Sequence, residues 1–295
     1  MILNVSGRTD IVAFYTPWFM NRYKEGYLDV RNPFNSKLVN RINFSNVDLI
    51  LFCTKNPLPI IDRIKEIDKP IIFHVTLTPY KKDIEPYVID KRLVIEGIKR
   101  LSGILGSDNV VVRYDPIFLS DSYTLMYHIR AFDKMCKLLK GYVKKVVVSF
   151  LDDYKNVRYN MRYLRLRAFT EEDYKQIGLN FSRSALENGM SVQTCFEERN
   201  LVNYGFTRGE CLSLSLAEKI TGKKPKKWKA RGKKGCNCAE MVDVGVYNTC
   251  KHFCKYCYAN YDEKAVFKNV RKHSNLSPML TGNVTQKDSI KERNN

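Results

Sequence analysis

Short runs of β-branched and other apolar residues alternate along the chain with longer segments that mix apolar and polar positions. Seven runs have the length of strands, at residues 2–6, 47–53, 71–77, 110–114, 145–150, 190–195 and 242–247. Their nearly continuous apolar character is typical of strands covered on both faces. Segments 90–105, 122–140 and 170–188 are long enough for helices between them. The pattern predicts an α/β fold of repeated βα units around a parallel sheet.

The loops that follow these strands are rich in polar, charged and thiol side chains. They include GRTD (7–10), TKNP (54–57), RYDP (113–116), SFLDD (149–153) and TCFEE (194–198). Such residues are also ordinary in turns and helix caps, so each motif alone has two interpretations. In βα folds functional groups gather where strands end, so together the loops predict a site on one rim. Glu197 and Glu198 are candidates for a proton donor or a ligand of a cationic group, or else simple carboxylates at a helix start.

The 295-residue chain contains nine cysteines. It has 44% hydrophobic residues, no apolar run long enough for a membrane span and no basic leader before an apolar stretch, which predicts a globular cytoplasmic protein. In a reducing compartment clustered thiols favour metal binding or chemistry over disulfides. Cys53 and Cys136 lie within apolar patterns and are expected to be small buried hydrophobic residues.

Three cysteines, Cys250, Cys254 and Cys257, stand close together in the loop after the last predicted strand. Each of three thiolates can take one corner iron of a cubane cluster, which leaves the fourth iron open for reaction. The same spacing also suits half of a zinc site whose fourth ligand comes from elsewhere. Tyr256 could lie against a planar ligand at the open iron, and His252 is expected to be a spacer.

Four further cysteines form a second candidate set. They are Cys195, Cys211, Cys236 and Cys238. Four thiolates are enough for an auxiliary 4Fe-4S cluster or for a structural zinc, and the set is also open to an unligated or partly ligating interpretation.

A formal charge of +19 biases the surface towards polyanions such as nucleic acid. Segment 222–235 contains eight basic and no acidic residues, which suits either a phosphate-contacting arm or a flexible solvated linker. In segment 154–167 two tyrosines and two arginines recur at helical spacing. The tyrosines could stack on bases while the arginines hold phosphates, although ordinary amphipathicity explains the pattern nearly as well. These residues are Tyr159, Tyr163, Arg158 and Arg162.

The loop CKHFCKYCYA (250–259) resembles the cysteine loop of radical S-adenosylmethionine enzymes, and YCYA with the downstream SPML is most similar to the spore photoproduct lyase branch. Over nearly the full length, the chain resembles the uncharacterised bacterial family domain of unknown function 1848. The motifs that carry this are GRTDIVAFYTPWFMNR, RNPFN, TKNP, DIEP, RYDPIF and DVGVYNTCKHFCKYCYAN. The resemblance implies a partial TIM-like barrel with parallel strands, a 4Fe-4S cluster, reductive cleavage of S-adenosylmethionine, and an electron donor such as flavodoxin or ferredoxin.

The superfamily's cysteine loop normally follows the first barrel strand, whereas here it is near the C-terminal end, so the resemblance implies a circular permutation. Strand 242–247 would then lie beside strand 2–6. On this interpretation Cys250, Cys254 and Cys257 hold the catalytic cluster. Thr9 and Asp10 are candidates for the amino group of S-adenosylmethionine, and Arg113, Ser149 and Lys55 for its carboxylate or ribose.

The expected organisation is a βα barrel over 1–200, an auxiliary cysteine and basic region over 201–241, the permuted strand, cluster loop and helix over 242–281, and a flexible tail over 282–295. The predicted function is a radical S-adenosylmethionine enzyme of unknown, possibly nucleic-acid-related, substrate. The alternative is a non-catalytic, zinc-containing nucleic-acid-binding protein that uses the same cysteines and the basic arm 222–235.

Overall fold

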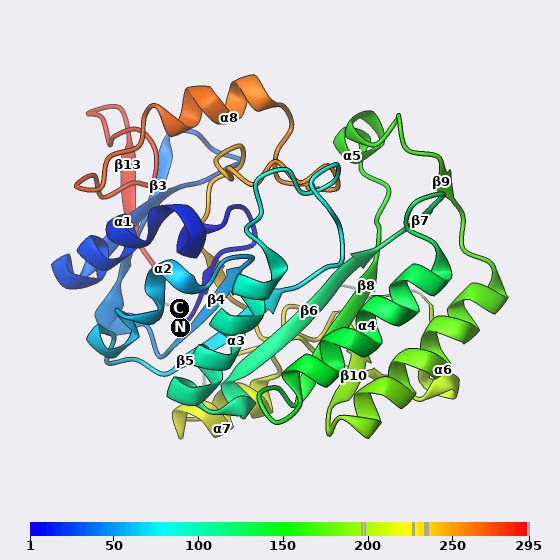
Figure 1. Cartoon of the computed structure of the whole chain (residues 1–295). Helices are drawn as coiled ribbons and strands as arrows, with labels where there is room; N and C mark the ends of the chain where they lie inside the picture. Colours follow the sequence, from blue (N-terminus) through cyan, green and yellow to red (C-terminus); the bar gives the residue numbers. More distant parts are fainter. Residues whose placement is uncertain (196, 198, 226–227, 233–235, 294–295) are drawn as a thin grey trace.

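A computed structural model of the chain describes residues 1–195, 197, 199–225, 228–232 and 236–293. Its main feature is an eight-stranded sheet in which all neighbouring strands are parallel, in the order β11-β10-β8-β6-β5-β4-β1-β12 (Figure 1). The strands are β1 (Ile2–Val5), β4 (Leu49–Thr54), β5 (Ile71–Thr76), β6 (Val110–Ile117), β8 (Lys145–Phe150), β10 (Ser191–Thr194), β11 (Thr207–Arg208) and β12 (Val242–Asp243). The predicted α/β fold with a parallel sheet is confirmed. The sheet is open, with β11 and β12 at its edges, and does not close into a barrel.

Strand β12 pairs with β1 at the edge of the sheet, as the sequence predicted, with Leu3 opposite Val242. It is shorter than expected because the carboxylate of Asp243 turns the chain. One oxygen of Asp243 accepts a 2.7 Å hydrogen bond from the backbone of Gly245, and the other accepts one of 2.7 Å from Gly7. Strand pairing therefore stops where the loop towards Cys250 begins.

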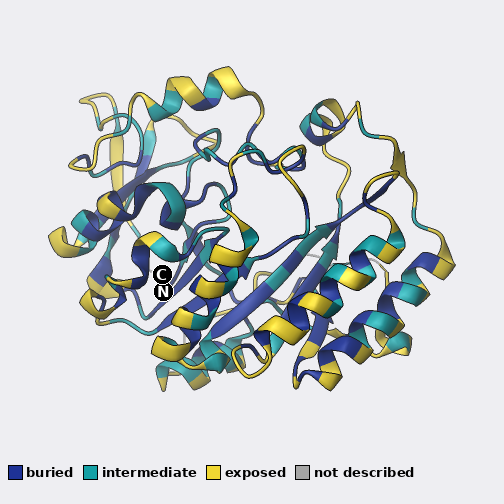
Figure 2. Ribbon diagram, viewed as in Figure 1, coloured by how far each residue is buried: buried dark blue, intermediate teal, exposed yellow. Residues whose placement is uncertain are grey.

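One face of the sheet is covered by five helices (Figure 1). These are α1 (Ile11–Glu25), α2 (Leu58–Ile61), α3 (Lys91–Leu105), α4 (Leu125–Leu139) and α6 (Glu171–Glu187). Each turns a buried stripe towards the sheet and an exposed one towards solvent (Figure 2). The starts of α4 and α6 follow from local sequence, since Thr124 and Thr170 cap these helices with their hydroxyl groups.

The opposite face of the sheet is covered at the amino ends of the strands. Here α7 (Leu214–Thr221) and the adjoining loops pack Leu212, Ala217 and Ala239 against side chains of β1, β4, β5, β6 and β8. Apolar burial therefore closes this half. The other half, at the carboxyl ends, is left for polar side chains and a cavity.

A second sheet lies beside α1. It consists of β2 (Tyr27–Arg31), β3 (Leu38–Asn43) and β13 (Ser289–Glu292), and the sequence did not predict it. Strand β13 falls within the expected flexible tail, yet it pairs in parallel with β3 and is preceded by a 2.5 Å ion pair between Arg31 and Asp288. The other strands and α-helices are β7 (Leu119–Ser120), β9 (Leu166–Arg167), α5 (Lys155–Asn160) and α8 (Glu263–Val270). None of the described helices is long and apolar enough to cross a membrane.

Candidate functional site

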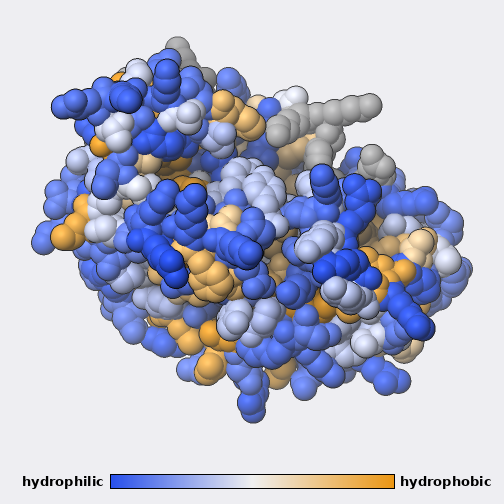
Figure 3. All heavy atoms as spheres, turned by 90° about the horizontal axis from the view of Figure 1, so that it is seen from above, coloured by the Kyte–Doolittle hydropathy of each residue, from blue (hydrophilic) through white to orange (hydrophobic). Residues whose placement is uncertain are grey.

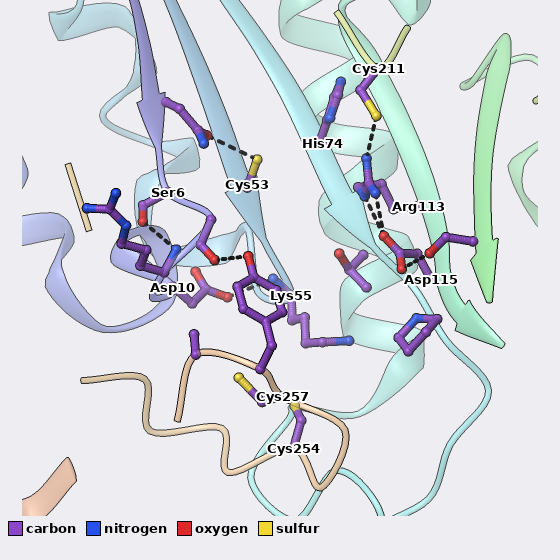
Figure 4. Close-up of a pocket in the computed structure, with 18 of the residues that line it drawn as sticks. Ser6, Asp10, Cys53, Lys55, His74, Arg113, Asp115, Cys211, Cys254 and Cys257 are labelled. Atoms are coloured by element: carbon purple, nitrogen blue, oxygen red, sulfur yellow. Dashed lines mark hydrogen bonds and ion pairs between the residues drawn. The ribbon is translucent and has the colours of Figure 1, made fainter. Parts of the chain in front are cut away.

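A cavity of about 550 Å³ lies at the carboxyl ends of the parallel strands. The loops after β1, β4, β8 and β10 contribute to its wall, as the sequence predicted, and the loop with Cys250, Cys254 and Cys257 completes it. The RYDP motif, predicted as a loop, instead contributes Arg113, Asp115 and Pro116 from within β6. In Figure 4, Cys254 and Cys257 lie towards one end of the cavity, and Cys211, His74 and Arg113 lie towards the other. The cavity thus brings the first cysteine set and part of the second to one space.

The loop that carries Cys250, Cys254 and Cys257 is held by side chains from other parts of the chain. Asn260 donates a 2.8 Å hydrogen bond to the carbonyl of Cys250, and Asn156 of α5 donates one of 2.8 Å to the carbonyl of Cys257. Tyr15 of α1 donates a 2.7 Å bond to the carbonyl of Thr249. The backbone is fixed by these contacts, and all three cysteines line the cavity.

The thiols of this loop are close enough to influence one another. Burial raises the pKa of Cys250, and the neighbouring thiolates of Cys257 and Cys254 raise it further. The three sulphurs do not, however, all lie within 4.8 Å of one another. Among the described residues, the sulphurs of Cys195, Cys211 and Cys238 do. Three thiolates on one ion have to be closer than this, whereas a cubane distributes them over separate irons.

Asp10 joins the start of α1 to this loop. One oxygen accepts hydrogen bonds from the backbone of Ala13 (2.9 Å) and the hydroxyl of Thr54 (2.8 Å). The other accepts from the backbone of Lys55 (2.7 Å) and contacts Nε2 of His252 at 2.9 Å. Both oxygens of Asp10, expected to bind a ligand's amino group, are therefore engaged within the chain. His252, expected to be a spacer, anchors the loop.

Lys55 and Tyr256 meet on Glu85, a carboxylate that is 1% exposed. Oε1 of Glu85 accepts hydrogen bonds from Lys55 (2.8 Å) and the hydroxyl of Tyr256, and Oε2 pairs with Lys91. Burial alone would raise the pKa of Glu85, but the two ammonium groups outweigh it and hold the pKa at about 2. The ring of Tyr256 lies 5.3 Å from the Lys55 ammonium, so both side chains are held beside Cys254.

The sequence signals pointed to the DIEP motif but assigned no role to Glu85 or Lys91. Spacing could not reveal the cluster, because Glu85 and Tyr256 are 171 residues apart.

The structure brings together three members of the second cysteine set. The sulphurs of Cys195, Cys211 and Cys238 all lie within 4.8 Å of one another, and those of Cys195 and Cys238 are 3.6 Å apart. This group could hold a metal ion. Cys236 lines the same cavity but is not a member of the group. Hydrogen bonds from the thiols of Cys195 and Cys238 lower the pKa of Cys211, as does the charge of Arg113.

Arg113 and Ser149 meet on Asp115, which sequence analysis did not single out. Nε of Arg113 donates a 2.9 Å hydrogen bond to Asp115, whose other oxygen accepts from the hydroxyl of Ser149. Arg113 also donates to the sulphur of Cys211 at 3.0 Å. These two predicted ligand-binding residues therefore lie with the second cysteine group.

Two buried polar atoms on the cavity wall lack a hydrogen-bond partner within the described chain. They are Oγ1 of Thr9, which is 6% exposed, and Nε2 of His74, which is 1% exposed. Buried polar atoms are nearly always bonded, so these two are suited to a ligand. Glu197 also faces the cavity, and burial raises its pKa to about 7. Glu198 lies outside the described residues.

Cys53 and Cys136 differ from the expectation in one respect. Cys136 is fully buried in the helix-covered core, as predicted. Cys53 is half-buried on the cavity wall, and its thiol donates to Oδ1 of Asn4 at 3.5 Å. Burial raises the pKa of Cys53 to about 12, which keeps this thiol protonated.

The basic arm 222–235 is described only in part, and its described lysines contact acidic residues. Lys223 lies 3.1 Å from Asp48, and Lys229 lies 3.3 Å from Glu240. Lys226, Lys227, Lys233 and Lys234 lie outside the described residues. In segment 154–167, α5 ends at Asn160, so the predicted helical spacing does not extend to Tyr163.

Comparison with known protein families matches residues 2–259 to domain of unknown function 1848. The chain belongs to this family. The match spans both cysteine sets and the strands that carry the cavity. No curated protein and no solved structure matches the chain. The family's description assigns no activity, so function has to be argued from the cavity.

Proposed function

We propose that the chain is a radical S-adenosylmethionine enzyme whose catalytic 4Fe-4S cluster is held by Cys250, Cys254 and Cys257. The observation that carries the proposal is the placement of these three thiols. They come from one loop, face a cavity large enough for a cofactor, and are spread more widely than the ligands of a single ion. The order of strands supports a circularly permuted, partial TIM-like barrel, since β12 pairs with β1 and leads into the cysteine loop.

The residues around these thiols fit the proposed cofactors. Three thiolates provide the ligands of a site-differentiated cluster, which when bound with S-adenosylmethionine supplies reductive cleavage to a 5′-deoxyadenosyl radical. The unpartnered hydroxyl of Thr9 offers a hydrogen bond to the amino or carboxylate group of that ligand. Asp10, with both oxygens engaged, acts instead as a positioning residue for the loop.

Charged side chains beside Cys254 support the same assignment. Lys55 and Lys91 against the single carboxylate of Glu85 leave one net positive charge next to this thiol. Positive charge stabilises thiolates and a reduced, anionic cluster. Delivery of the electron would come from a small reducing protein such as flavodoxin or ferredoxin.

We infer that the substrate is related to nucleic acid. The guanidinium of Arg162 lies 3.9 Å from the ring centre of Tyr159 and 4.3 Å from that of Tyr163. Tyr159 is 63% exposed and Tyr163 is 81% exposed. Exposed aromatic rings beside arginine provide a surface for bases and phosphates. Tyr159 lies in the last turn of α5 and Arg162 and Tyr163 follow it, while Asn156 of the same helix contacts the cysteine loop at the cavity. Viewed from above, the molecule is mainly hydrophilic with small separate hydrophobic patches (Figure 3).

Anaerobic reconstitution with iron and sulphide tests the proposed function. The wild-type chain is expected to turn brown and to release 5′-deoxyadenosine from S-adenosylmethionine on reduction. Cys254→Ala is expected to abolish this release, while Cys136→Ala, which alters a thiol in the distant core, keeps it. A colourless protein with zinc at these cysteines, or release that survives Cys254→Ala, would contradict the proposal.

A further inference from the structure

The group formed by Cys195, Cys211 and Cys238 has the dimensions of a site for one metal ion. Its sulphurs lie within 4.8 Å of one another, with 3.6 Å between Cys195 and Cys238. A tetrahedral zinc ion with Zn–S bonds of about 2.3 Å places its sulphurs roughly 3.8 Å apart. A cubane needs a wider arrangement, because each thiolate binds a different iron. The observed separation therefore favours a single ion over a second cluster.

The fold builds this group from three separate segments. The backbone of Gly209 donates to the carbonyl of Thr194 at 3.2 Å, which brings the loop after β11 to the end of β10. The backbone of Ala239 donates to the carbonyl of Leu212 at 2.8 Å and places Cys238 beside Cys211. The group is thus set by backbone pairing along the sheet edge.

Hydrogen bonds to the sulphurs resemble those around metal-bound thiolates. The backbone N–H of Cys211 donates to the sulphur of Cys238 at 3.3 Å, and Nη1 of Arg113 donates to that of Cys211 at 3.0 Å. Such outer contacts orient thiolate ligands and offset their negative charge. Because Asp115 holds Arg113, the guanidinium is fixed in this position.

We propose that Cys195, Cys211 and Cys238 bind one zinc-class ion whose fourth position faces the cavity and takes a soft donor, the thiol of a small thiol-bearing ligand. All three residues line the cavity, and no fourth His, Cys, Asp or Glu of the described chain joins their group. Structural zinc sites are closed by four protein ligands, whereas functional sites keep one position open. Three thiolates make the ion electron-rich, so it prefers a thiolate over water or a carboxylate. The inference does not depend on the chemistry proposed for Cys250, Cys254 and Cys257.

Zinc binding to a full-length chain carrying Cys250→Ser, Cys254→Ser and Cys257→Ser isolates this site. We expect this triple variant to bind one zinc ion per chain. Addition of Cys211→Ser should abolish zinc binding, whereas addition of Cys236→Ser should preserve it. X-ray absorption at the zinc edge should show three sulphurs at about 2.3 Å and one lighter ligand. Addition of 2-mercaptoethanol should replace the lighter ligand with a fourth sulphur.

Two results would overturn the inference. The first is a zinc ion with four sulphur ligands before any thiol is added, together with loss of zinc in Cys236→Ser. This result would indicate a structural site closed by four cysteines. The other is an iron–sulphur cluster, with an iron–iron distance at the iron edge, on these cysteines after reconstitution of the triple variant. If the triple variant fails to fold, the zinc-edge spectra of the wild type and of Cys236→Ser provide the first of these tests, since the first cysteine set is proposed to hold iron. Absence of a cluster at Cys250, Cys254 and Cys257 would contradict the proposed function and leave this site unaffected.

Discussion

Asp10 and His252 meet at 2.9 Å across 242 residues of sequence, and this contact fastens the cysteine loop to the start of α1. The same carboxylate accepts from Ala13, Thr54 and Lys55, so one side chain aligns a helix, the end of β4 and the loop. A ligand-binding role for Asp10 would require some of these bonds to break. The structure therefore assigns Asp10 to positioning.

Asp10→Asn should lower the free energy of unfolding by about 1–3 kcal/mol, because the amide group faces donors that need an acceptor. Asn caps helices as well as Asp does, so loss of the cap itself does not contribute. Asp262→Asn is the matched control, since Asp262 caps α8 by accepting a hydrogen bond from the nearby backbone of Ala265. Urea unfolding of Asp10→Asn, His252→Gln and the double variant measures the coupling. Additive losses would show that the two residues do not act together.

Glu85→Gln should destabilise the chain by about 3–5 kcal/mol, because it removes a buried carboxylate and leaves the half-buried ammonium groups of Lys55 and Lys91 without their shared partner. Glu66→Gln, which breaks an exposed pair with Arg63, should have a much smaller effect, because solvent screens this pair. Urea midpoints at pH 7 compare the two. Equal effects would contradict the assignment of Glu85 as the buried centre of the cluster.

The pH dependence of the wild type follows from the same carboxylate. A folded-state pKa of about 2 lies below the ordinary value of 4.5, so Glu85 contributes stability above pH 4.5 that is lost as the pH falls towards 2. Glu85→Gln should show a shallower loss over this window. Parallel unfolding curves for the two proteins between pH 5 and 2 would be evidence against the low pKa.

Glu197 should show the opposite dependence. Its pKa of about 7 lies above the ordinary value of 4.5, so the stability contributed by its protonated form is complete below pH 4.5 and lost as the pH rises through 7. Glu197→Gln keeps an acceptor for the backbone of Phe150 and removes the titration. We expect the variant to match the wild type at pH 4 and to exceed its stability at pH 8. A constant difference would refute the raised pKa.

Tyr163→Ala should weaken binding of single-stranded nucleic acid by about 1–3 kcal/mol if bases stack there. Tyr142→Ala is the control, since Tyr142 is also exposed beside a cation, Lys99, but lies before β8, away from the cavity. Fluorescence titration at several salt concentrations measures both. An affinity that changes neither with salt concentration nor with either substitution would exclude this surface as the nucleic-acid interface.

The β-branched runs predicted seven of the eight strands of the main sheet, because burial on both faces leaves a continuous apolar signal. Strand β12 was placed correctly next to β1, although its end depended on the carboxylate of Asp243 and was predicted four residues late. Strand β13 was missed, since all four of its residues are exposed and polar residues dominate it. Short exposed strands carry little pattern for periodicity to detect.

The candidate site was predictable where chemistry depends on residue type and not where it depends on tertiary pairing. The thiols of both sets stood out by spacing, and three of the four in the second set meet as expected. The roles of Asp10, Glu85 and Asp115 depend on partners that are 242, 171 and 34 residues away, respectively. No local motif encodes which oxygen remains free for a ligand.

Mössbauer spectroscopy of the reconstituted chain, with and without S-adenosylmethionine, distinguishes an open cluster iron from a fully ligated one. We expect a 4Fe-4S cluster with one iron whose parameters change on addition of S-adenosylmethionine, and loss of this signal in Cys254→Ala. A cluster with four equivalent, protein-ligated irons that does not respond, or a single metal ion at Cys250, Cys254 and Cys257, would contradict it.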